Sequence, residues 1–432
     1  MITTRARLAL AAGAGARWAS RVTGRGAGAM IGGLVAIALD RSVLRQLGAG
    51  RRTVIVTGTN GKSTTTRMTA AALRTLGVVA TNAEGANMDA GLVAALAADR
   101  DAKLAVLEVD EMHVPHVLDA MEAALVVLLN LSRDQLDRVG EIAVIERTLR
   151  AGLARHPRTV VVANCDDVLM TSAAYDSSQV VWVAAGGAWS RDSVSCPRSG
   201  QVIVREHGQW YSTGADFKRP NPHWWFDDDT LYGPNGLALP MRLALPGSVN
   251  RGNAAQAVAA AVTLGVDPAS AVTAVSRVDE VAGRYRTWRL GEHVIRLLLA
   301  KNPAGWQEAL SMVDTHADGV VIAVNGRVAD GEDLSWLWDV SFERLADQPG
   351  GPRGAGASRG EADEDKRREH PPVVAAGERG TDLAVRLEYA RVRHTLVHDP
   401  VAAIASCPPG RVEVVANYTA FLQLQRRLAR LK

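Results

Sequence analysis

One short segment limits the possible folds of this chain more than any other: a glycine-rich turn between a predicted strand and a predicted helix. The turn covers residues 57–64 and reads TGTNGKST, after a β-branched run at 53–56 and before a Thr-, Ala- and Leu-rich stretch at 63–76. Such a turn lets backbone N–H groups approach phosphate oxygens, while Lys62 can reach the β- and γ-phosphates and the Ser63 hydroxyl can ligate Mg²⁺. The pattern predicts ATP binding. The candidate nucleotide-binding residues of the turn are Thr57, Gly58, Thr59, Asn60, Gly61, Lys62, Ser63 and Thr64.

The turn is a shortened variant of the common phosphate loop, because the full pattern would need glycine where Val56 stands. The alternative, a glycine-rich turn that merely precedes a helix, is disfavoured by the strand before it.

A second signal is the segment 107–111, LEVDE, at the end of another predicted strand. Its acidic residues belong at the carboxyl edge of the sheet, where ligands bind in open α/β folds, and carboxylates are ligands that Mg²⁺ prefers. The alternative interpretation of these acidic residues is a solvent-exposed strand end that binds no metal ion.

The rest of the chain predicts an α/β protein with two sheets. Short apolar runs at 104–109, 125–129 and 160–163 alternate with helical stretches, as expected for a parallel sheet covered by helices on both faces. We expect three parts along the chain: a helical lead-in at 1–50, a central ATP-binding domain at 51–284, and a second Rossmann-like α/β domain at 285–432. The central domain is expected to contain a β-rich insertion at 185–245, and the second domain a mobile loop at 347–372.

Composition excludes several classes of protein. A net charge of +3 is too balanced for a protein that coats nucleic acid, and 47% hydrophobic residues argue against global disorder. The only cysteines are Cys165, Cys196 and Cys407, which excludes a four-cysteine zinc site and indicates a reducing compartment. The apolar runs near the amino terminus are too short to span a bilayer, so we expect a cytoplasmic protein. Arginine-rich termini favour either contact with the inner membrane face or a solvated basic surface.

The turn variant resembles the Mur ligase superfamily, ATP-dependent enzymes that activate a carboxylate as an acyl phosphate and join it to an amine. By this resemblance Glu108 is the magnesium-binding glutamate, together with Ser63. The segment 130–137 is also similar to the superfamily, although Gln135 stands where a histidine is common, which leaves a metal-ligand role there in doubt.

Two further motifs continue the resemblance in the expected order along the chain. The segment 247–253, GSVNRGN, is similar to the adenine-side motif, and it implies that Asn250 and Asn253 contact the nucleotide. The pair Gly283-Arg284 matches the end of the central domain and implies that Arg284 lies near the phosphates. Taken singly, each motif is equally well read as turn or cap residues.

The carboxy-terminal half resembles one branch of the superfamily, the MurT family of ligase subunits of lipid II isoglutaminyl synthases. The similar segments are 300–306, 330–343, 377–390 and 417–420. The resemblance implies a catalytic Asp339 at the junction with a GatD-type glutaminase, and a phosphate- or substrate-facing Lys301. The alternative for Asp339 is a cap between buried Trp338 and Phe342.

Many MurT proteins carry a four-cysteine zinc ribbon, and the segments 196–200 and 210–220 resemble its remnant. Only Cys196 remains, so we expect no structural zinc, since such sites need about four N or S ligands. We expect the insertion to be stabilised by aromatic packing instead. The residues expected to pack are Trp210, Trp224, Trp225 and Phe226.

The resemblance implies an enzyme that uses ATP and Mg²⁺ to amidate the α-carboxylate of D-glutamate in the lipid II stem peptide, with Lys62, Glu108 and Asp339 as catalytic residues. Releasing ammonia from glutamine requires an activated cysteine, and none of the three cysteines has a suitable setting. A glutaminase partner would therefore supply ammonia in a heterodimer. Two alternatives remain: an amino-acid ligase that acts without a glutaminase, and a degraded nucleotide-binding scaffold.

Overall fold

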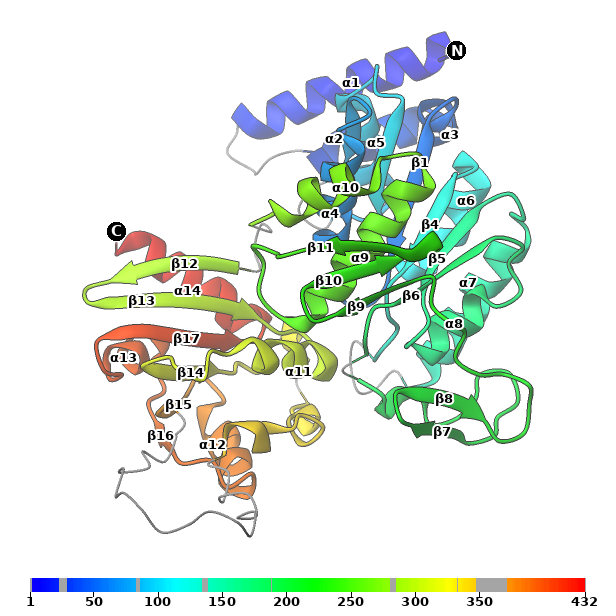
Figure 1. Cartoon of the computed structure of the whole chain (residues 1–432). Helices are drawn as coiled ribbons and strands as arrows, with labels where there is room; N and C mark the ends of the chain where they lie inside the picture. Colours follow the sequence, from blue (N-terminus) through cyan, green and yellow to red (C-terminus); the bar gives the residue numbers. More distant parts are fainter. Residues whose placement is uncertain are drawn as a thin grey trace. The chain divides into compact units, whose positions relative to one another are not determined.

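The computed structural model describes residues 2–22, 29–82, 86–133, 139–187, 189–279, 285–331, 333–346 and 371–431 (Figure 1). The chain forms two compact units. The first comprises Met1–Arg133 and Arg138–Val281, and the second comprises Asp134–Asp137 and Ala282–Lys432. Most of the expected loop at 347–372 lies outside the described residues, as do Gln135 and Arg284.

Unit 1 is built on a nine-stranded sheet with the order β11-β10-β9-β6-β5-β4-β1-β3-β2. The strands from β1 to β6 are parallel, β9 continues the parallel arrangement beside β6, and β10 and β11 are antiparallel additions at that edge. The predicted α/β class with a parallel sheet is confirmed. The strands are β1 (Arg52–Thr57), β2 (Val79–Thr81), β3 (Leu104–Glu108), β4 (Leu125–Leu128), β5 (Val160–Asn164), β6 (Val180–Ala184), β9 (Trp224–Asp227), β10 (Thr230–Gly233) and β11 (Leu237–Pro240).

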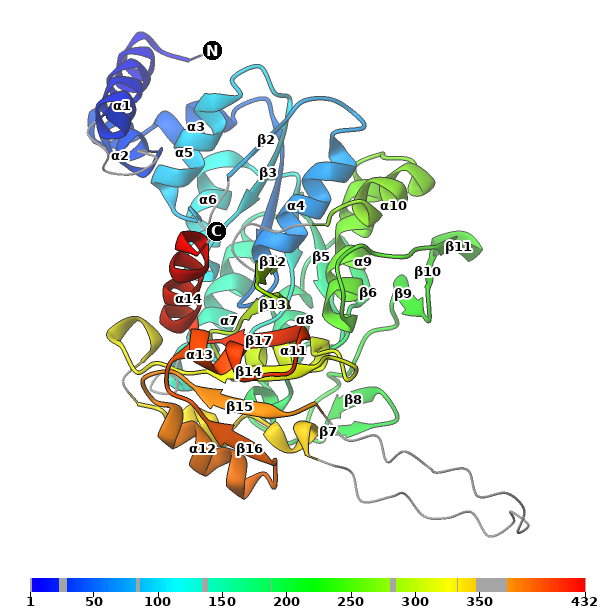
Figure 2. The same cartoon turned by 90° about the vertical axis from the view of Figure 1, so that its left-hand side faces the viewer.

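Helices cover both faces of this sheet (Figures 1 and 2). One face carries α4 (Lys62–Leu73), α9 (Ser248–Thr263) and α10 (Pro268–Ser276), which contact one another. The other face carries α5 (Asp89–Ala98), α6 (Val114–Met121), α7 (Val139–Ala154) and α8 (Val168–Ala174), which share one apolar core with the strands. Because β1, β3 and β4 are interior strands of the sheet and are buried on both faces, their Val, Ile and Leu runs are continuous rather than alternating.

Three helices precede β1: α1 (Thr4–Val22), α2 (Ala29–Leu39) and α3 (Val43–Gly48). Glycines allow α2 to approach its neighbours closely. A Cβ on Gly13 would lie 2.4 Å from the carbonyl oxygen of Gly32, and one on Gly33 would lie 1.9 Å from the carbonyl oxygen of Ala90 in α5. Among the described residues, no helix combines the length and apolar character that a membrane crossing would need.

The β-rich region expected at 185–245 divides into two parts. A separate hairpin of β7 (Ile203–Glu206) and β8 (Gln209–Ser212) has a small core of Val168, Cys196, Ile203, Trp210 and Phe217. The following strands, β9 to β11, instead extend the main sheet. Of the four aromatic residues expected to stabilise this region, Trp210 belongs to the hairpin core, whereas the other three lie in β9 of the main sheet. Trp224 is buried in the main sheet, while Trp225 is 38% exposed and stacks on Tyr232.

Unit 2 contains a six-stranded sheet with the order β12-β13-β17-β14-β15-β16, parallel except for the β12–β13 hairpin. One face carries α11 (Pro303–Met312), α12 (Gly380–Tyr389) and the short 3₁₀ helices η6 (Ser335–Trp338) and η7 (Phe342–Leu345). The other carries α13 (Pro400–Ala405) and α14 (Tyr418–Arg430). The strands are β12 (Tyr285–Leu290), β13 (His293–Leu299), β14 (Gly319–Ala323), β15 (Val373–Ala376), β16 (His394–Leu396) and β17 (Gly410–Ala416).

Candidate functional site

The glycine-rich turn joins the end of β1 to the start of α4, as the sequence predicts. Gly58 and Gly61 have φ values of +141° and +85°. A Cβ on Gly58 would lie 2.8 Å from the Cβ of Leu129, and one on Gly61 would lie 2.7 Å from Oδ1 of Asn253. Glycine is needed at both positions for conformation and for space. The first N–H groups of α4 have no intrahelical acceptor and are the groups that would bind a phosphate.

Asn130, which follows β4, holds the turn in place. Its Oδ1 accepts a hydrogen bond from the backbone N–H of Asn60 at 3.0 Å, and its Nδ2 donates to the carbonyl oxygen of Asn60 at 3.0 Å. The backbone N–H of Thr59 donates to the carbonyl oxygen of Asn130 at 2.8 Å. The flanking residues Thr57 and Thr64 are buried. These three hydrogen bonds hold the turn against the end of β4. Sequence reasoning gave Asn130 no role, because its partner lies 70 residues away.

Lys62 is folded back onto its own turn. Its Nζ donates to the carbonyl oxygens of Gly58 at 2.5 Å and Thr59 at 3.3 Å, and forms an ion pair with Oε1 of Glu111 at 3.1 Å. Burial raises the pKa of Glu111, and the nearby Lys62 ammonium opposes that rise. A bound triphosphate would offer Lys62 stronger acceptors, since charge-assisted bonds to phosphate are strong.

Ser63 and Glu108 form the pair expected for Mg²⁺. The Ser63 hydroxyl donates to Oε2 of Glu108 at 2.7 Å, at the carboxyl edge of β3. The side chain of Asn82 fixes the Glu108 backbone with two hydrogen bonds, both of 2.8 Å. A hydroxyl and a carboxylate next to a phosphate-binding turn are the hard oxygen ligands that Mg²⁺ takes, so the residues present fit this ion.

Asn250 and Asn253 approach the turn from the first half of α9. Both side chains are buried, and they are linked by a hydrogen bond of 3.4 Å from Nδ2 of Asn253 to Oδ1 of Asn250. The Asn253 amide occupies the space that a side chain at position 61 would fill. The structure therefore brings together, within unit 1, the turn, Glu108 and both asparagines.

The remaining described candidates, Lys301 and Asp339, belong to unit 2. Lys301 is exposed, and its Nζ lies 5.0 Å from the centre of the Tyr418 ring. Asp339 is half-buried directly after η6, and its backbone N–H donates to the carbonyl oxygen of Trp336 at 3.0 Å. The expectation that Trp338 is buried is wrong, since this side chain is 53% exposed.

Arg386 of α12 clamps the segment that carries Asp339. Its Nε donates to the carbonyl oxygen of Leu337 at 3.1 Å, and its Nη2 donates to that of Val340 at 2.7 Å. These two carbonyls flank Asp339 on either side. The guanidinium also lies over the rings of Trp338 and Phe342, at 5.4 and 5.5 Å. The position of Asp339 therefore depends on a residue that the sequence did not single out.

An asparagine pair joins two neighbouring strand ends in unit 2. The backbone N–H of Asn325, after β14, donates to Oδ1 of Asn417 at 3.0 Å, and Nδ2 of Asn417, after β17, donates to the carbonyl oxygen of Asn325 at 2.7 Å. The backbone N–H of Glu378, after β15, donates to Oδ1 of Asn325. Lys301 follows the neighbouring β13 at the same edge. This polar edge is where open α/β sheets bind ligands.

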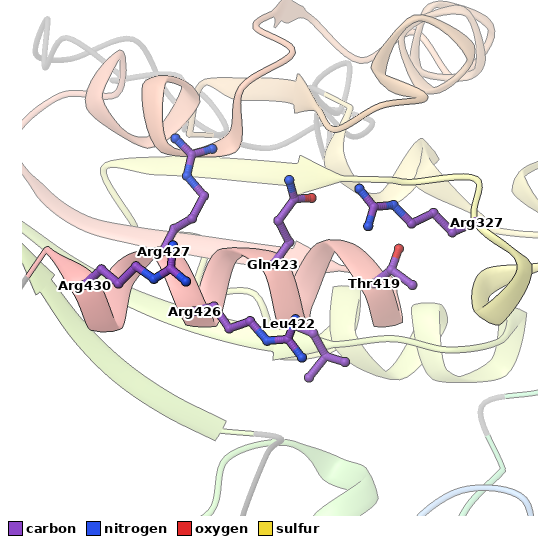
Figure 3. A pocket seen from close by; sticks show the side chains of 7 residues that line it. All are labelled: Arg327, Thr419, Leu422, Gln423, Arg426, Arg427 and Arg430. Carbon is purple, nitrogen blue, oxygen red and sulfur yellow. The ribbon is translucent and has the colours of Figure 1, made fainter. Parts of the chain in front are cut away.

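Unit 2 also contains a basic cavity of about 330 Å³ along α14 (Figure 3). Arg327 is paired with Glu378, and Arg427 is paired with Asp399, while Arg426 and Arg430 are exposed. Four guanidinium groups along one cavity would favour an anionic ligand. The lining residues are Arg327, Thr419, Leu422, Gln423, Arg426, Arg427 and Arg430.

All three cysteines are buried. Burial raises the pKa of Cys165 to about 12 and that of Cys407 to about 11, which keeps both as unreactive thiols. For Cys196, burial acts in the same direction, but hydrogen bonds from Ser199, Ser212 and backbone N–H groups outweigh it and lower the pKa. Cys196 lies in the core of the β7–β8 hairpin.

Comparison with known proteins gives two family matches. Residues 56–261 match the Mur ligase middle domain family, and residues 299–364 match the MurT ligase C-terminal family. The chain is 27% identical to the lipid II isoglutaminyl synthase (glutamine-hydrolyzing) subunit MurT of Streptococcus pneumoniae, over 94% of this chain and 93% of the relative. It is also 27% identical to the subunit of the same name from Staphylococcus aureus, over 96% of each chain.

Solved structures agree on the fold. A pseudomurein peptide ligase type C from Methanothermus fervidus matches with a TM-score of 0.67 and 16% identity, over 91% of this chain and 81% of that one. MurF from Acinetobacter baumannii matches with a TM-score of 0.64 and 17% identity, over 92% and 80%. At these identities the likeness concerns the fold alone.

Proposed function

Because the chain belongs to the MurT family of Mur ligases, we propose that it is the ligase subunit of a lipid II isoglutaminyl synthase. Its substrate would be the α-carboxylate of D-glutamate in the lipid II stem peptide. ATP transfers its γ-phosphoryl group to that carboxylate, giving an acyl phosphate and ADP. Ammonia then displaces inorganic phosphate and loses a proton, which gives D-isoglutamine. The observation that carries the proposal is the Ser63–Glu108 pair beside the phosphate-binding turn.

In this scheme the turn and the start of α4 bind the nucleotide. Lys62 would leave Glu111 and contact the β- and γ-phosphates, and Ser63 and Glu108 would hold Mg²⁺, which would supply charge neutralisation at the phosphates. Asn250, Asn253 and Arg284 contribute further nucleotide contacts, and Lys301 faces the phosphate or the substrate. Catalysis of phosphoryl transfer rests mostly on positioning and on charge stabilisation, which these residues supply.

Asp339 is the proposed catalytic residue of unit 2, where the partner docks. Two exposed aromatic residues support a docking surface beside it: Trp338 is 53% exposed, and it packs edge-on against Tyr389, which is 72% exposed. Aromatic residues of this kind are enriched in protein interfaces. The unsuitable thiols described above support the need for a separate glutaminase of the GatD type.

A lipid-linked substrate places the enzyme at the inner face of the plasma membrane. The basic cavity along α14 supports this proposal, because clustered arginines near a surface attract anionic lipids. We expect binding to vesicles that contain anionic lipid and weaker binding as salt is raised. Equal binding to zwitterionic vesicles would contradict the proposal.

The first test is Lys62→Ala, assayed with ATP, Mg²⁺ and lipid II. Removing the only ammonium at the turn should abolish ATP turnover and amidation, and Lys62→Arg should not restore them, because a guanidinium does not substitute for this compact charge. Lys103→Ala is the matched control, since Lys103 is an exposed lysine before β3. Normal lipid II amidation by Lys62→Ala would contradict the proposed function.

The second test is Asp339→Asn, which keeps the size of the side chain but removes its charge. We expect amidation to fall at least a hundredfold while ATP affinity, measured by calorimetry, stays within about twofold. Loss of both would instead indicate a folding role.

The amine donor is tested by adding ammonium or glutamine, each with and without the glutaminase. Ammonium should support amidation by the ligase alone, whereas glutamine should require the partner. Activity with an amino acid and no glutaminase would indicate an amino-acid ligase. Nucleotide binding without any ligation under all conditions would indicate a degraded scaffold.

A further inference from the structure

Two histidines and one aspartate of unit 1 form a compact cluster that the proposed reaction does not use. Nε2 of His113 lies 2.7 Å from Oδ1 of Asp89, and Nε2 of His116 lies 3.1 Å from Oδ2 of the same carboxylate. One donor atom from each residue can be chosen so that all three lie within 4.8 Å of one another. The centroids of the two imidazole rings are 4.9 Å apart.

Local structure explains why these side chains meet. His113 ends the 3₁₀ helix η1 (Glu111–His113) and caps α6, and His116 lies in the first turn of α6. Residues three apart on a helical turn are neighbours on one face. Asp89 is the first residue of α5 and approaches from the preceding connection. The cluster therefore joins the β2–α5 connection to the β3–α6 connection.

The ligand chemistry is that of a zinc-class ion. Two imidazole nitrogens and a carboxylate oxygen are typical ligands for Zn²⁺, and three protein ligands leave a fourth position for water. Tetrahedral Zn²⁺ with bonds of about 2.0–2.1 Å sets its ligand atoms roughly 3.3 Å apart. The nitrogen–oxygen separations of 2.7 and 3.1 Å are close to this value but involve different oxygens of Asp89, so side-chain rotations are needed for all three residues to bind one ion. The His116 side chain is 58% exposed, which gives the ion a path from solvent.

We propose that Asp89, His113 and His116 bind a zinc-class divalent cation that fastens the segment carrying Glu108 and Glu111 to the start of α5. The same two connections are already joined by Asn82, which bonds the Glu108 backbone, and by a 3.2 Å bond from the N–H of Asp110 to the carbonyl oxygen of Asn87. The ion adds a third link, which fixes the residues that ligate Mg²⁺ and restrain Lys62. Binding of the cation by these three residues is independent of the proposed function. Its restraint of the residues that ligate Mg²⁺ and contact Lys62 rests on the proposed function.

The test titrates the full chain, free of any histidine tag and treated with a chelator, with Co²⁺ alone and then with Zn²⁺ alone. We expect one equivalent of Co²⁺ with visible absorption bands of a tetrahedral nitrogen and oxygen site and without a thiolate band. Zn²⁺ should displace the bound Co²⁺ and raise the midpoint temperature for thermal unfolding of unit 1. His113→Ala and His116→Ala should each weaken Co²⁺ binding at least tenfold and remove the Zn²⁺-dependent rise.

His156→Ala is the matched control, because Nε2 of His156 lies 2.7 Å from Oδ1 of Asp119 in a pair that has no second imidazole among its contacts. This variant should bind Co²⁺ as the unchanged chain does. Glu108→Gln should also retain Co²⁺ binding, which separates this site from the proposed Mg²⁺ site. Circular dichroism of each variant confirms folding. Absence of stoichiometric binding, or binding retained by the His113→Ala/His116→Ala double variant, would overturn the proposal whether or not the chain amidates lipid II.

Discussion

Gly61 shows how one position can serve the backbone and the site together. Its φ of +85° lets the chain turn directly into α4, and its lack of a side chain admits the Asn253 amide. The same contact ties α9 to the phosphate-binding turn although the two residues are far apart in the sequence. The Asn253 amide therefore lies against the turn because position 61 is a glycine, a contact that the 247–253 motif alone does not reveal.

We expect Gly61→Ala to lower ATP affinity at least tenfold. Alanine in the left-handed region costs about 1–2 kcal/mol, and the new Cβ would lie 2.7 Å from Oδ1 of Asn253, so the turn or α9 must shift. Gly50→Ala is the matched control: its φ is +77°, but no atom lies within 4 Å of the new Cβ. That variant should lose a similar amount of stability and keep its ATP affinity in calorimetry. Equal loss of affinity in both variants would contradict the steric argument.

At the scale of elements, the sequence could propose only site residues that share a local pattern, because residues that meet through packing leave no local signal. The turn at 57–64 is contiguous, and Glu108 lies at a strand end, so both were predicted. Asp89 and His113 are 24 residues apart, and their contact depends on how α5 packs beside η1. Likewise, β9–β11 look like an insertion by composition, because a local pattern does not say which sheet edge a strand joins.

The clamp of Arg386 on the η6–η7 segment gives a prediction at this scale. Arg386→Ala leaves the buried carbonyls of Leu337 and Val340 without their donor, at about 1–3 kcal/mol for each. We expect the free energy of unfolding of unit 2 to fall by about 2–6 kcal/mol and amidation to fall more than tenfold, with ATP affinity nearly unchanged. Denaturant unfolding and the amidation assay measure these effects.

Arg344→Ala is the control for that variant, because Arg344 is an exposed arginine on the same segment, in η7. It should behave like the unchanged chain. Arg386→Lys should give an intermediate loss, since an ammonium lacks the planar fork that reaches both carbonyls. Unaltered amidation by Arg386→Ala would show that Asp339 is positioned by other contacts.

At the scale of the whole molecule, the alternation of apolar runs and helical stretches was enough to predict two α/β sheets. The strand orders were not predictable in the same way, because each parallel pair depends on a crossover connection rather than on neighbouring residues. The hydrophobic clusters described above each lie within one unit: unit 1 has one around Ile55 and Leu107 and the small core of the β7–β8 hairpin, and unit 2 has two, around Trp306 and Phe421. Separate cores make separate cooperative unfolding a direct expectation.

We therefore expect two transitions in calorimetric unfolding, of which the transition of unit 1 responds more strongly to nucleotide. A ligand that binds the folded state stabilises it by about 2.7 kcal/mol at a concentration of 100 Kd. Because the turn, Ser63, Glu108 and Asn253 all belong to unit 1, ATP with Mg²⁺ should raise the transition of that unit. Lys62→Ala should abolish the nucleotide-dependent shift of the unit 1 transition. Arg386→Ala should lower the transition of unit 2 and leave that nucleotide-dependent shift unchanged. A single transition whose midpoint temperature rises with nucleotide would show instead that the two units unfold as one cooperative structure. The stability effects of Arg386→Ala and Gly61→Ala would then appear in that one transition.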